Sequence, residues 1–325
     1  MKLNECSKLG KCILSLFLAV VLFLGTVMPV WAVNSSGDPK HCREVRFADP
    51  GWSDVTGKTA IASRILSGLG YRPVSIMVSL HVSYLSLKNG DVDVFLGGWL
   101  PAQKSIFEPL VKAGSIEKLG INLPDAMYSL GVMDYTYEKG LRHFKDIATF
   151  RKELNNKIYG LAPGGDGNEI LGAMIRENRF NLRGFKLIAS SEQAMLAAVD
   201  KLAKKREDIV FLAWAPHPMN RKHPIKYLSG GELPTGAFGI AEVYTVSRAG
   251  YSAECKNVAK FLSALKFTLP MEEELMGLIM DGMHPMKAAA DWVRKNQDVW
   301  HVWLNDVTDF YGGSGLLAVE NDLRS

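Results

Sequence analysis

Short apolar runs alternate along the chain with amphipathic segments that have helical spacing. From residue 44 the order is strand, helix, strand, helix, strand, and the same order returns from residue 157. The predicted elements of the first unit are 44–48, 56–69, 74–78, 82–88 and 91–97, and those of the second are 157–163, 169–177, 185–190, 191–205 and 208–214. Strands that alternate with helices are typical of parallel sheets with crossover connections. The pattern therefore predicts two β-α-β-α-β units and an α/β fold.

The segments between and after these units complete the pattern. A helix is predicted at 106–119 and a strand at 127–133; further strands are predicted at 226–231 and 241–247, and helices at 255–267, 271–280 and 285–295. A chain of this length exceeds one typical hydrophobic core. We expect lobe I to comprise residues 44–126 and 216–325 and lobe II residues 127–215, with two chain crossings that form a hinge.

The beginning of the chain has the pattern of a secretory signal. Three lysines precede an apolar run at 13–28, and the small residues Val30 and Ala32 follow it. This order predicts a cleavable signal peptide over residues 1–32. An uncleaved membrane anchor is the alternative, because the run approaches spanning length. We expect cleavage near Ala32, a soluble and extracytoplasmic mature chain from Val33, and a loose start.

Removal of that segment changes the charge and the cysteine content. The whole chain has 38 Lys and Arg against 34 Asp and Glu, and without residues 1–32, which hold three Lys and one Glu, the balance is 35 against 33. This near-neutral balance argues against a nucleic acid partner. Only Cys42, at the end of a tail over 33–43, and Cys255 remain. In an oxidising compartment a disulfide is the expected state, and two isolated cysteines are too few ligands for a metal site.

Three tryptophans, Trp52, Trp99 and Trp214, lie at the junctions between predicted strands and the loops that follow them. Ligands of open α/β sheets bind beyond the carboxyl ends of the strands. One such tryptophan most often serves packing, but three at equivalent ends would face one cleft. Aromatic faces bind quaternary ammonium groups through their ring quadrupoles. Core positions are expected for the remaining tryptophans of the mature chain, Trp292, Trp300 and Trp303.

The stretch FADPGWSDVTGKTA, residues 47–60, ends like a phosphate-binding loop. Such a loop needs four residues between its first glycine and the glycine before the lysine, whereas five separate Gly51 from Gly57. Trp52 is too bulky for close backbone approach, and Asp54 would repel phosphate oxygens. The stretch therefore favours a cation over a nucleotide.

Several motifs together resemble those of one protein family. They are GWSD (51–54), SLKNGDVDVFLGGWLP (86–101), KIYGLAPGGDGN (157–168), SSEQAMLA (190–197), FLAWAPHPMN (211–220), YLSGG (227–231) and AGYSAEC (249–255). In this order they resemble the periplasmic choline-binding proteins of ABC transporters, within the glycine betaine/choline-binding family. The resemblance covers nearly the whole mature chain, and GWxD, LGxW and WxPHPMN are its specific motifs.

The resemblance implies a two-lobed periplasmic binding protein of type II, in which each lobe is a mostly parallel sheet flanked by helices and the ligand cleft lies between the lobes. Such a protein closes on choline and delivers it to an inner-membrane ABC permease. It is a monomer, is no enzyme, and needs neither a cofactor nor a metal.

The resemblance also implies the residues of the site. By motif, Trp52 and Trp99 from lobe I and Tyr128 and Trp214 from lobe II enclose the trimethylammonium group. Asp54 hydrogen-bonds the choline hydroxyl and supplies countercharge. From the residues alone, Tyr128 is an ordinary strand aromatic, and Asp54 could be the N-cap of the following helix.

Other residues match the family less simply. Cys42 and Cys255 match the cysteines that pair. Gly165 stands where the family has an Asn that contacts the ligand hydroxyl, so Asp166 or a water would replace that contact. Asp166 and Asn168 also precede a helix, and capping is the simpler role for both. His217 has no ligand partner at metal spacing and is interpreted as structural. The other histidines are scattered, and Ser190, Ser191 and Glu192 indicate a helix start.

Three alternatives to choline transport stay open. A glycine betaine or carnitine receptor of the same family would bring a ligand carboxylate towards Asp54, and no Arg or Lys occurs in the aromatic motifs to receive it. An enzyme acting on choline esters needs a nucleophile and a base, and no GxSxG elbow is present. A sensor that presents choline to a membrane receptor would use the same fold.

Overall fold

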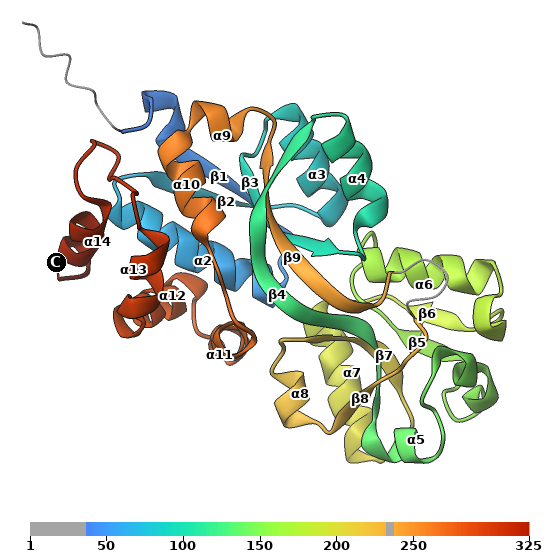
Figure 1. Cartoon of the computed structure of the whole chain (residues 1–325). Coiled ribbons are helices and arrows are strands. Elements are labelled where there is room, and N and C mark those ends of the chain that lie inside the picture. The colour runs from blue at the N-terminus through green and yellow to red at the C-terminus, as the bar shows by residue number, and fades with distance from the viewer. Residues whose placement is uncertain (1–36, 232–236, 325) are drawn as a thin grey trace, which may run out of the picture. The chain divides into compact units, whose positions relative to one another are not determined.

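The computed structural model describes residues 37–231 and 237–324 (Figure 1). The predicted signal peptide lies outside these residues. Every helix within them is too short or too polar to cross a lipid bilayer.

One sheet of nine strands runs through the described residues. The strands are β1 (Glu44–Asp49), β2 (Arg72–Met77), β3 (Val94–Leu100), β4 (Ile116–Met133), β5 (Lys157–Tyr159), β6 (Lys186–Ile188), β7 (Val210–Ala215), β8 (Ile225–Tyr227) and β9 (Gly239–Arg248). Their order is β2-β1-β3-β9-β4-β7-β5-β6, and β8 pairs with β4 beside this path. The sheet curls, because two of its strands are long and bend through the molecule (Figure 1).

The two β-α-β-α-β units are confirmed. In the first, α2 (Ser53–Gly68) and α3 (Leu80–Asn89) connect β1, β2 and β3, and β1 pairs in parallel with both other strands. In the second, α6 (Asp166–Arg176) and α7 (Glu192–Lys204) connect β5, β6 and β7, and β5 pairs in parallel with both. The carboxyl ends of the strands within each unit therefore lie at one edge.

The antiparallel strands β4 and β9 join the two units. β4 pairs with β9 between Ile116 and Tyr128, and then with β7 from Met127 to Val132. Figure 1 shows both strands as long ribbons that leave the first unit and enter the second. A single strand thus contributes to both halves of the sheet.

The predicted helix at 106–119 is wrong in its second half. Helix α4 (Lys104–Lys112) ends before Gly114, which has a φ of +65°. That left-handed conformation suits glycine and ends a helix. Residues from Ile116 onwards belong to β4, which begins well before the strand predicted at 127–133.

The C-terminal part of the chain covers the first unit with helices. They are α9 (Tyr251–Glu254), α10 (Lys256–Ala264), α11 (Leu269–Met280), α12 (Pro285–Lys295), α13 (Gln297–Trp303) and α14 (Gly315–Arg324). Helices α11, α12 and α14 pack on α2. The three tryptophans of α12 and α13 are buried in the core, as expected: Trp292, Trp300 and Trp303.

The expected disulfide joins Cys42, in the short 3₁₀ helix η2 (Lys40–Cys42), to Cys255 at the start of α10. The expected loose start is wrong for the part that the structure describes. Asp38 accepts hydrogen bonds of 2.8 Å from the backbone N–H groups of Asn257 and Val258. The chain start is therefore held against α10 by a carboxylate as well as by the disulfide.

Short helices and the segment after β7 complete the second unit. Helix α5 (Asp134–Glu138) and the 3₁₀ helices η3 (Phe144–Phe150) and η4 (Arg179–Asn181) precede β7, whereas α8 (Met219–Lys222) follows it and leads into β8. β8 pairs with the Gly131–Met133 end of β4, and Ser229 bridges to His143. Residues 225–229 therefore pack with the half that the sequence assigned to 127–215.

Candidate functional site

The strand ends that carry tryptophan are built by short, tightly bonded turns. After β1, Gly51 takes a φ of +76° and donates its N–H to Asp49 at 2.8 Å. This left-handed turn places Trp52 as the N-cap of α2, which begins at Ser53 rather than at the predicted residue 56. Asp54 therefore lies in the first helical turn and is not the N-cap.

A small cavity lies where these strand ends meet, with a volume of about 30 Å³. Its lining residues are Trp52, Asp54, Trp99, Tyr128, Leu161, Asp166 and Trp214. We call this set the aromatic box. The five residues implied by the resemblance are all in it, and Asp166 joins them, whereas Gly165 is not a lining residue.

Three of the four aromatic walls stand on strands, Trp99 on β3, Tyr128 on β4 and Trp214 on β7. Tyr128 on β4 stands directly opposite Trp214 on β7. The rings of Trp99 and Tyr128 lie 6.0 Å apart, and Phe238 packs behind Tyr128 at 5.5 Å. Strand register therefore fixes Tyr128 relative to Trp214, and packing supports the ring of Tyr128 from behind.

Asp54 is bound from two sides inside the box. Its Oδ2 accepts a hydrogen bond of 3.0 Å from Trp99 Nε1, and it lies 3.5 Å from Lys58 Nζ. Lys58 is completely buried and also lies 3.3 Å from Glu272 on α11. Burial raises the pKa of Glu272 to about 7, against the opposing effect of Lys58. The site thus contains a carboxylate that shares one buried ammonium with a second acid behind it.

Asp166 is the second carboxylate of the box. It accepts hydrogen bonds from Tyr128 Oη at 3.0 Å and from the Gly167 N–H at 2.6 Å. Burial raises the pKa of the Asp166 carboxyl. Gly165 is the N-cap of α6, so the capping role expected for Asp166 and Asn168 is wrong. A Cβ on Gly167 would lie 2.2 Å from Tyr128 Oη, so only glycine fits there.

Asn168 and the neighbourhood of Trp214 shape the box from outside. Asn168 Oδ1 accepts from the Leu161 N–H at 2.9 Å, which fixes one wall. His217 is fully buried, and its ring packs edge-on against Trp214 at 4.7 Å. The structural role expected for His217 agrees with this burial.

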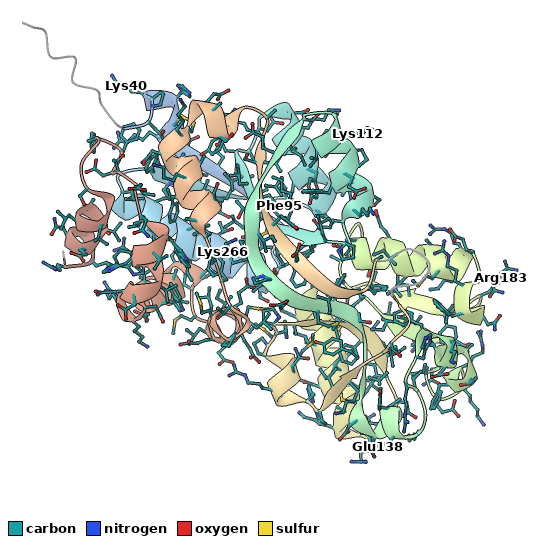
Figure 2. The ribbon with its side chains drawn as sticks, viewed as in Figure 1. Lys40, Phe95, Lys112, Glu138, Arg183 and Lys266 are labelled. Carbon is teal, nitrogen blue, oxygen red and sulfur yellow. A yellow bond between two sulfur atoms is a disulfide. The ribbon has the colours of Figure 1, made fainter. Side chains whose placement is uncertain are left out.

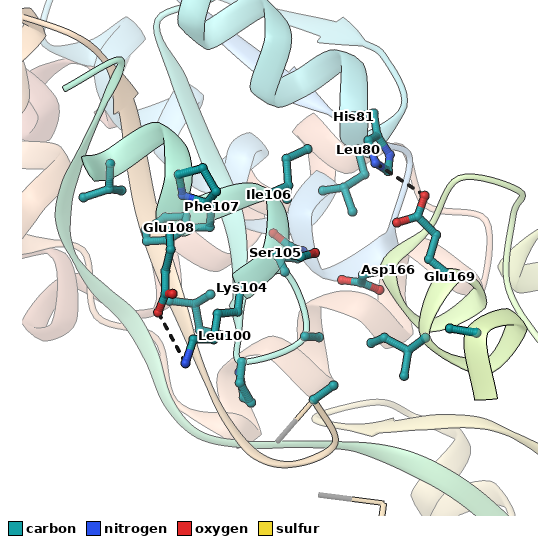
Figure 3. A pocket seen from close by; sticks show the side chains of 18 of the residues that line it. Leu80, His81, Leu100, Lys104, Ser105, Ile106, Phe107, Glu108, Asp166 and Glu169 are labelled. Carbon is teal, nitrogen blue, oxygen red and sulfur yellow. Dashed lines mark ion pairs between the residues drawn. The ribbon is translucent and has the colours of Figure 1, made fainter. Parts of the chain in front are cut away.

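A much larger cavity, of about 1070 Å³, opens between α4 and α6. Figure 3 shows its polar side chains, with ion pairs between His81 and Glu169 (3.4 Å) and between Lys104 and Glu108 (3.6 Å). These charges are already paired and solvent-exposed. Asp166 lines both cavities. We therefore take the aromatic box as the candidate site, because its lining combines aromatic rings with carboxylates, whereas the four charged groups named in the larger cavity are already paired.

Sequence reasoning missed Leu161, which lines the box, and four buried residues beside it, namely Ser53, Lys58, Glu192 and Glu272. Lys58 follows Asp54 by four residues, which is the spacing of a helical ion pair, and this signal was readable. Ser53 lies between two predicted site residues but has no feature of its own that points to the site, and Leu161, Glu192 and Glu272 reach the site from distant segments.

A family model described as the substrate binding domain of an ABC-type glycine betaine transport system matches residues 43–295. A protein of Chromohalobacter salexigens with the name uncharacterized protein ORF1 is 40% identical over 149 residues, which cover 46% of this chain and 93% of that protein.

Solved structures of ABC-transporter binding proteins are also similar to this chain. An ABC-transporter choline binding protein in complex with choline has 44% identity and a TM-score of 0.84, covering 88% of this chain and all of the other. Lactococcal OpuAC, closed on glycine betaine, has 25% identity and a TM-score of 0.72, covering 81% of this chain and 99% of the other. These similarities confirm the expected two-lobed α/β binding-protein fold.

Proposed function

The chain belongs to the family of substrate-binding domains of ABC-type glycine betaine transport systems, and we propose that it captures choline in the aromatic box and delivers it to a membrane permease. The observation that carries this proposal is the lining of the box. Three tryptophans, one tyrosine and two carboxylates converge there, and none of its described lining residues is a Lys or Arg.

The cation–π contacts of such a site contribute enough free energy for micromolar binding of a ligand. A desolvated cation–π contact contributes about 2 kcal/mol, so four rings contribute about 8 kcal/mol before the costs of association. Micromolar binding requires about 8 kcal/mol. Because the rings lie close together, the walls must separate slightly to admit a trimethylammonium group and then close on it.

The two carboxylates support choline over zwitterionic ligands. A ligand with its own carboxylate would bring a third negative group towards Asp54 and Asp166. A hydroxyl, in contrast, can donate a hydrogen bond to either. We therefore place glycine betaine and carnitine second, although lactococcal OpuAC holds glycine betaine.

The arrangement of strands supports closure of two lobes around the ligand. We propose that residues 44–126 and the C-terminal helices form lobe I, that residues from 127 onwards form lobe II, and that the hinge lies in β4 and β9. The return crossing would then follow residue 229 rather than residue 215. A ligand that bridges both lobes shifts the population towards the closed form.

We propose the periplasm as the location, with residues 1–32 removed. Substrate-binding proteins of ABC importers work outside the cytoplasm, and the family supports this assignment.

The test is a titration of tryptophan fluorescence with choline. The native protein should respond in the micromolar range. Trp214→Ala should weaken choline binding about 30-fold, which corresponds to one cation–π contact of about 2 kcal/mol, and Trp214→Phe, which keeps a ring, should lose clearly less. Equal affinities of native protein and Trp214→Ala would refute the role of the box.

A further inference from the structure

The side chain of Glu192, in the first turn of α7, lies against the first residue of α2. Its Oε1 accepts a hydrogen bond of 2.6 Å from Ser53 Oγ, and its Oε2 accepts one of 3.2 Å from the Ser53 N–H. Glu192 and Ser53 are each only 5% exposed. One buried carboxylate thus holds both donors of a single residue.

His217 supports Glu192 from behind. Its Nδ1 accepts a hydrogen bond of 3.0 Å from the Met219 N–H, so Nε2 carries the hydrogen and donates to Glu192 Oε1 at 3.2 Å. The carboxylate therefore has three donors, one from its own half of the molecule and two from the other.

The residues of this contact lie next to lining residues of the box but do not line the box themselves. Ser53 stands between Trp52 and Asp54, and the ring of His217 packs against Trp214. Glu192 is not a lining residue. It nevertheless connects the chain segments that carry box walls in the two halves.

The contact also joins two helices whose neighbouring strands lie far apart in the sheet. Helix α2 follows β1 and α7 precedes β7, and three strands, β3, β9 and β4, separate β1 from β7 in the sheet order. A movement that separates the two halves must break the bonds between Glu192 and Ser53. In the open form both groups can bind water instead, so the bonds favour the closed form by only part of their strength.

We propose that Glu192 is a positioning residue that latches α7 to the start of α2 in the closed form and slows escape of the ligand without touching it. This inference rests on the proposed function, because the ligand whose escape it slows is choline. The contact between His81 and Glu169 also joins the halves, but both side chains are about half exposed, and such pairs contribute little.

Variants of the latch test it through the kinetics of choline release. Glu192→Gln should speed choline dissociation about tenfold, because its amide cannot accept all three hydrogen bonds. Ser53→Ala should speed dissociation about threefold. The double variant should match Glu192→Gln, since both changes remove the same interaction between Glu192 and Ser53. Multiplied effects in the double variant, or single variants within twofold of native, overturn the latch.

Glu117→Gln is the matched control. Like Glu192, Glu117 is a carboxylate that accepts three hydrogen bonds, from the N–H groups of Gly250 and Ser252 and from Ser247 Oγ, but all of them lie within one half. It should leave choline dissociation unchanged. Thermal unfolding of the ligand-free variants identifies a loss of stability, and Ser53→Ala keeps the test valid if Glu192→Gln fails to fold.

A second measurement does not need choline. Spin labels at Lys112→Cys on α4 and Arg183→Cys before β6, both at the surface in Figure 2, report the distance between the halves. In ligand-free protein a short-distance population should be present and should shrink in Glu192→Gln. Identical distance distributions overturn the latch, whether or not choline binds. A native protein that shows this shift but binds no choline overturns the proposed function alone.

Discussion

At the scale of single residues, the box combines rings with carboxylates that are already hydrogen-bonded. Asp54 is held by Trp99 and lies near Lys58, and Asp166 is held by Tyr128. These contacts fix both carboxylates before the ligand arrives, which reduces the ordering that binding would otherwise cost. Preorganisation of this kind explains why polar groups occur within an aromatic site.

Gly165 offers a test of selectivity at this scale. Its φ of −80° suits any residue, and a Cβ would lie 3.2 Å from the Ala162 carbonyl oxygen. Gly165→Asn should be tolerated and should tighten choline binding about three- to tenfold, the range of one added net hydrogen bond. Ala162→Asn, at an exposed position of the same loop, controls for a general loop effect. Unchanged binding of choline by folded Gly165→Asn would contradict the expected hydroxyl contact.

Much of the site was predictable from sequence at this scale, for two different reasons. The three tryptophans were visible as strand ends that share a chemistry. Tyr128 was identified through the resemblance alone, because its importance depends on the pairing of β4 with β7, which brings it opposite Trp214. Glu192 and Glu272 reach the site only through tertiary packing and leave no local signal.

At the scale of elements, α2 and α11 share a buried ionic contact with a consequence for stability. Glu272 has a pKa of about 7 in the folded protein against 4.5 for the ordinary group. Between these values the folded state binds the proton more tightly, so the contribution of Glu272 to stability is fully present below pH 4.5 and is lost as the pH rises towards 7. The loss should be on the order of 3 kcal/mol.

Urea denaturation at pH 5 and pH 8 measures this effect. The native protein should lose stability between the two, whereas Glu272→Gln should lose clearly less. Glu274→Gln, exposed on the same helix, should behave as the native protein does. Equal free energies of unfolding of the native protein at both pH values would refute the raised pKa of Glu272.

The disulfide is a second contact at this scale. It closes a loop of 213 residues between the start of β1 and the start of α10. Replacing both cysteines, as Cys42→Ser with Cys255→Ser, should lower the free energy of unfolding by about 2 to 4 kcal/mol. Choline affinity should stay native, because the bond lies within one half. A large loss of affinity in the folded variant would instead link the disulfide to the site.

The helices show where local patterns suffice. α12 runs from Pro285 to Lys295, as predicted, because its amphipathic spacing and its proline at the first position are local signals. The segment after Gly114 was predicted as helix because its apolar residues fit that spacing too. Pairing with β9 makes it a strand, and a tertiary partner of this kind is invisible in a local window.

At the scale of the whole molecule, two β-α-β-α-β units were predictable, but the strands that join them were not. β4 and β9 belong to both halves, and their long antiparallel pairing connects residues more than 100 positions apart. The aromatic box lies where the halves meet. Ligand binding and the relative position of the halves are therefore expected to be one coupled event.

Isothermal titration calorimetry of the native protein with choline, glycine betaine, carnitine and acetylcholine tests the central claim most directly. The claim is that rings from both halves bind a permanently charged methylated nitrogen, while two carboxylates reject a ligand that carries its own. Choline should bind with micromolar affinity, and glycine betaine at least about tenfold more weakly, since repulsion near a buried carboxylate costs at least 1.4 kcal/mol. Tighter binding of glycine betaine than of choline, or no binding of any of the four, would contradict the account.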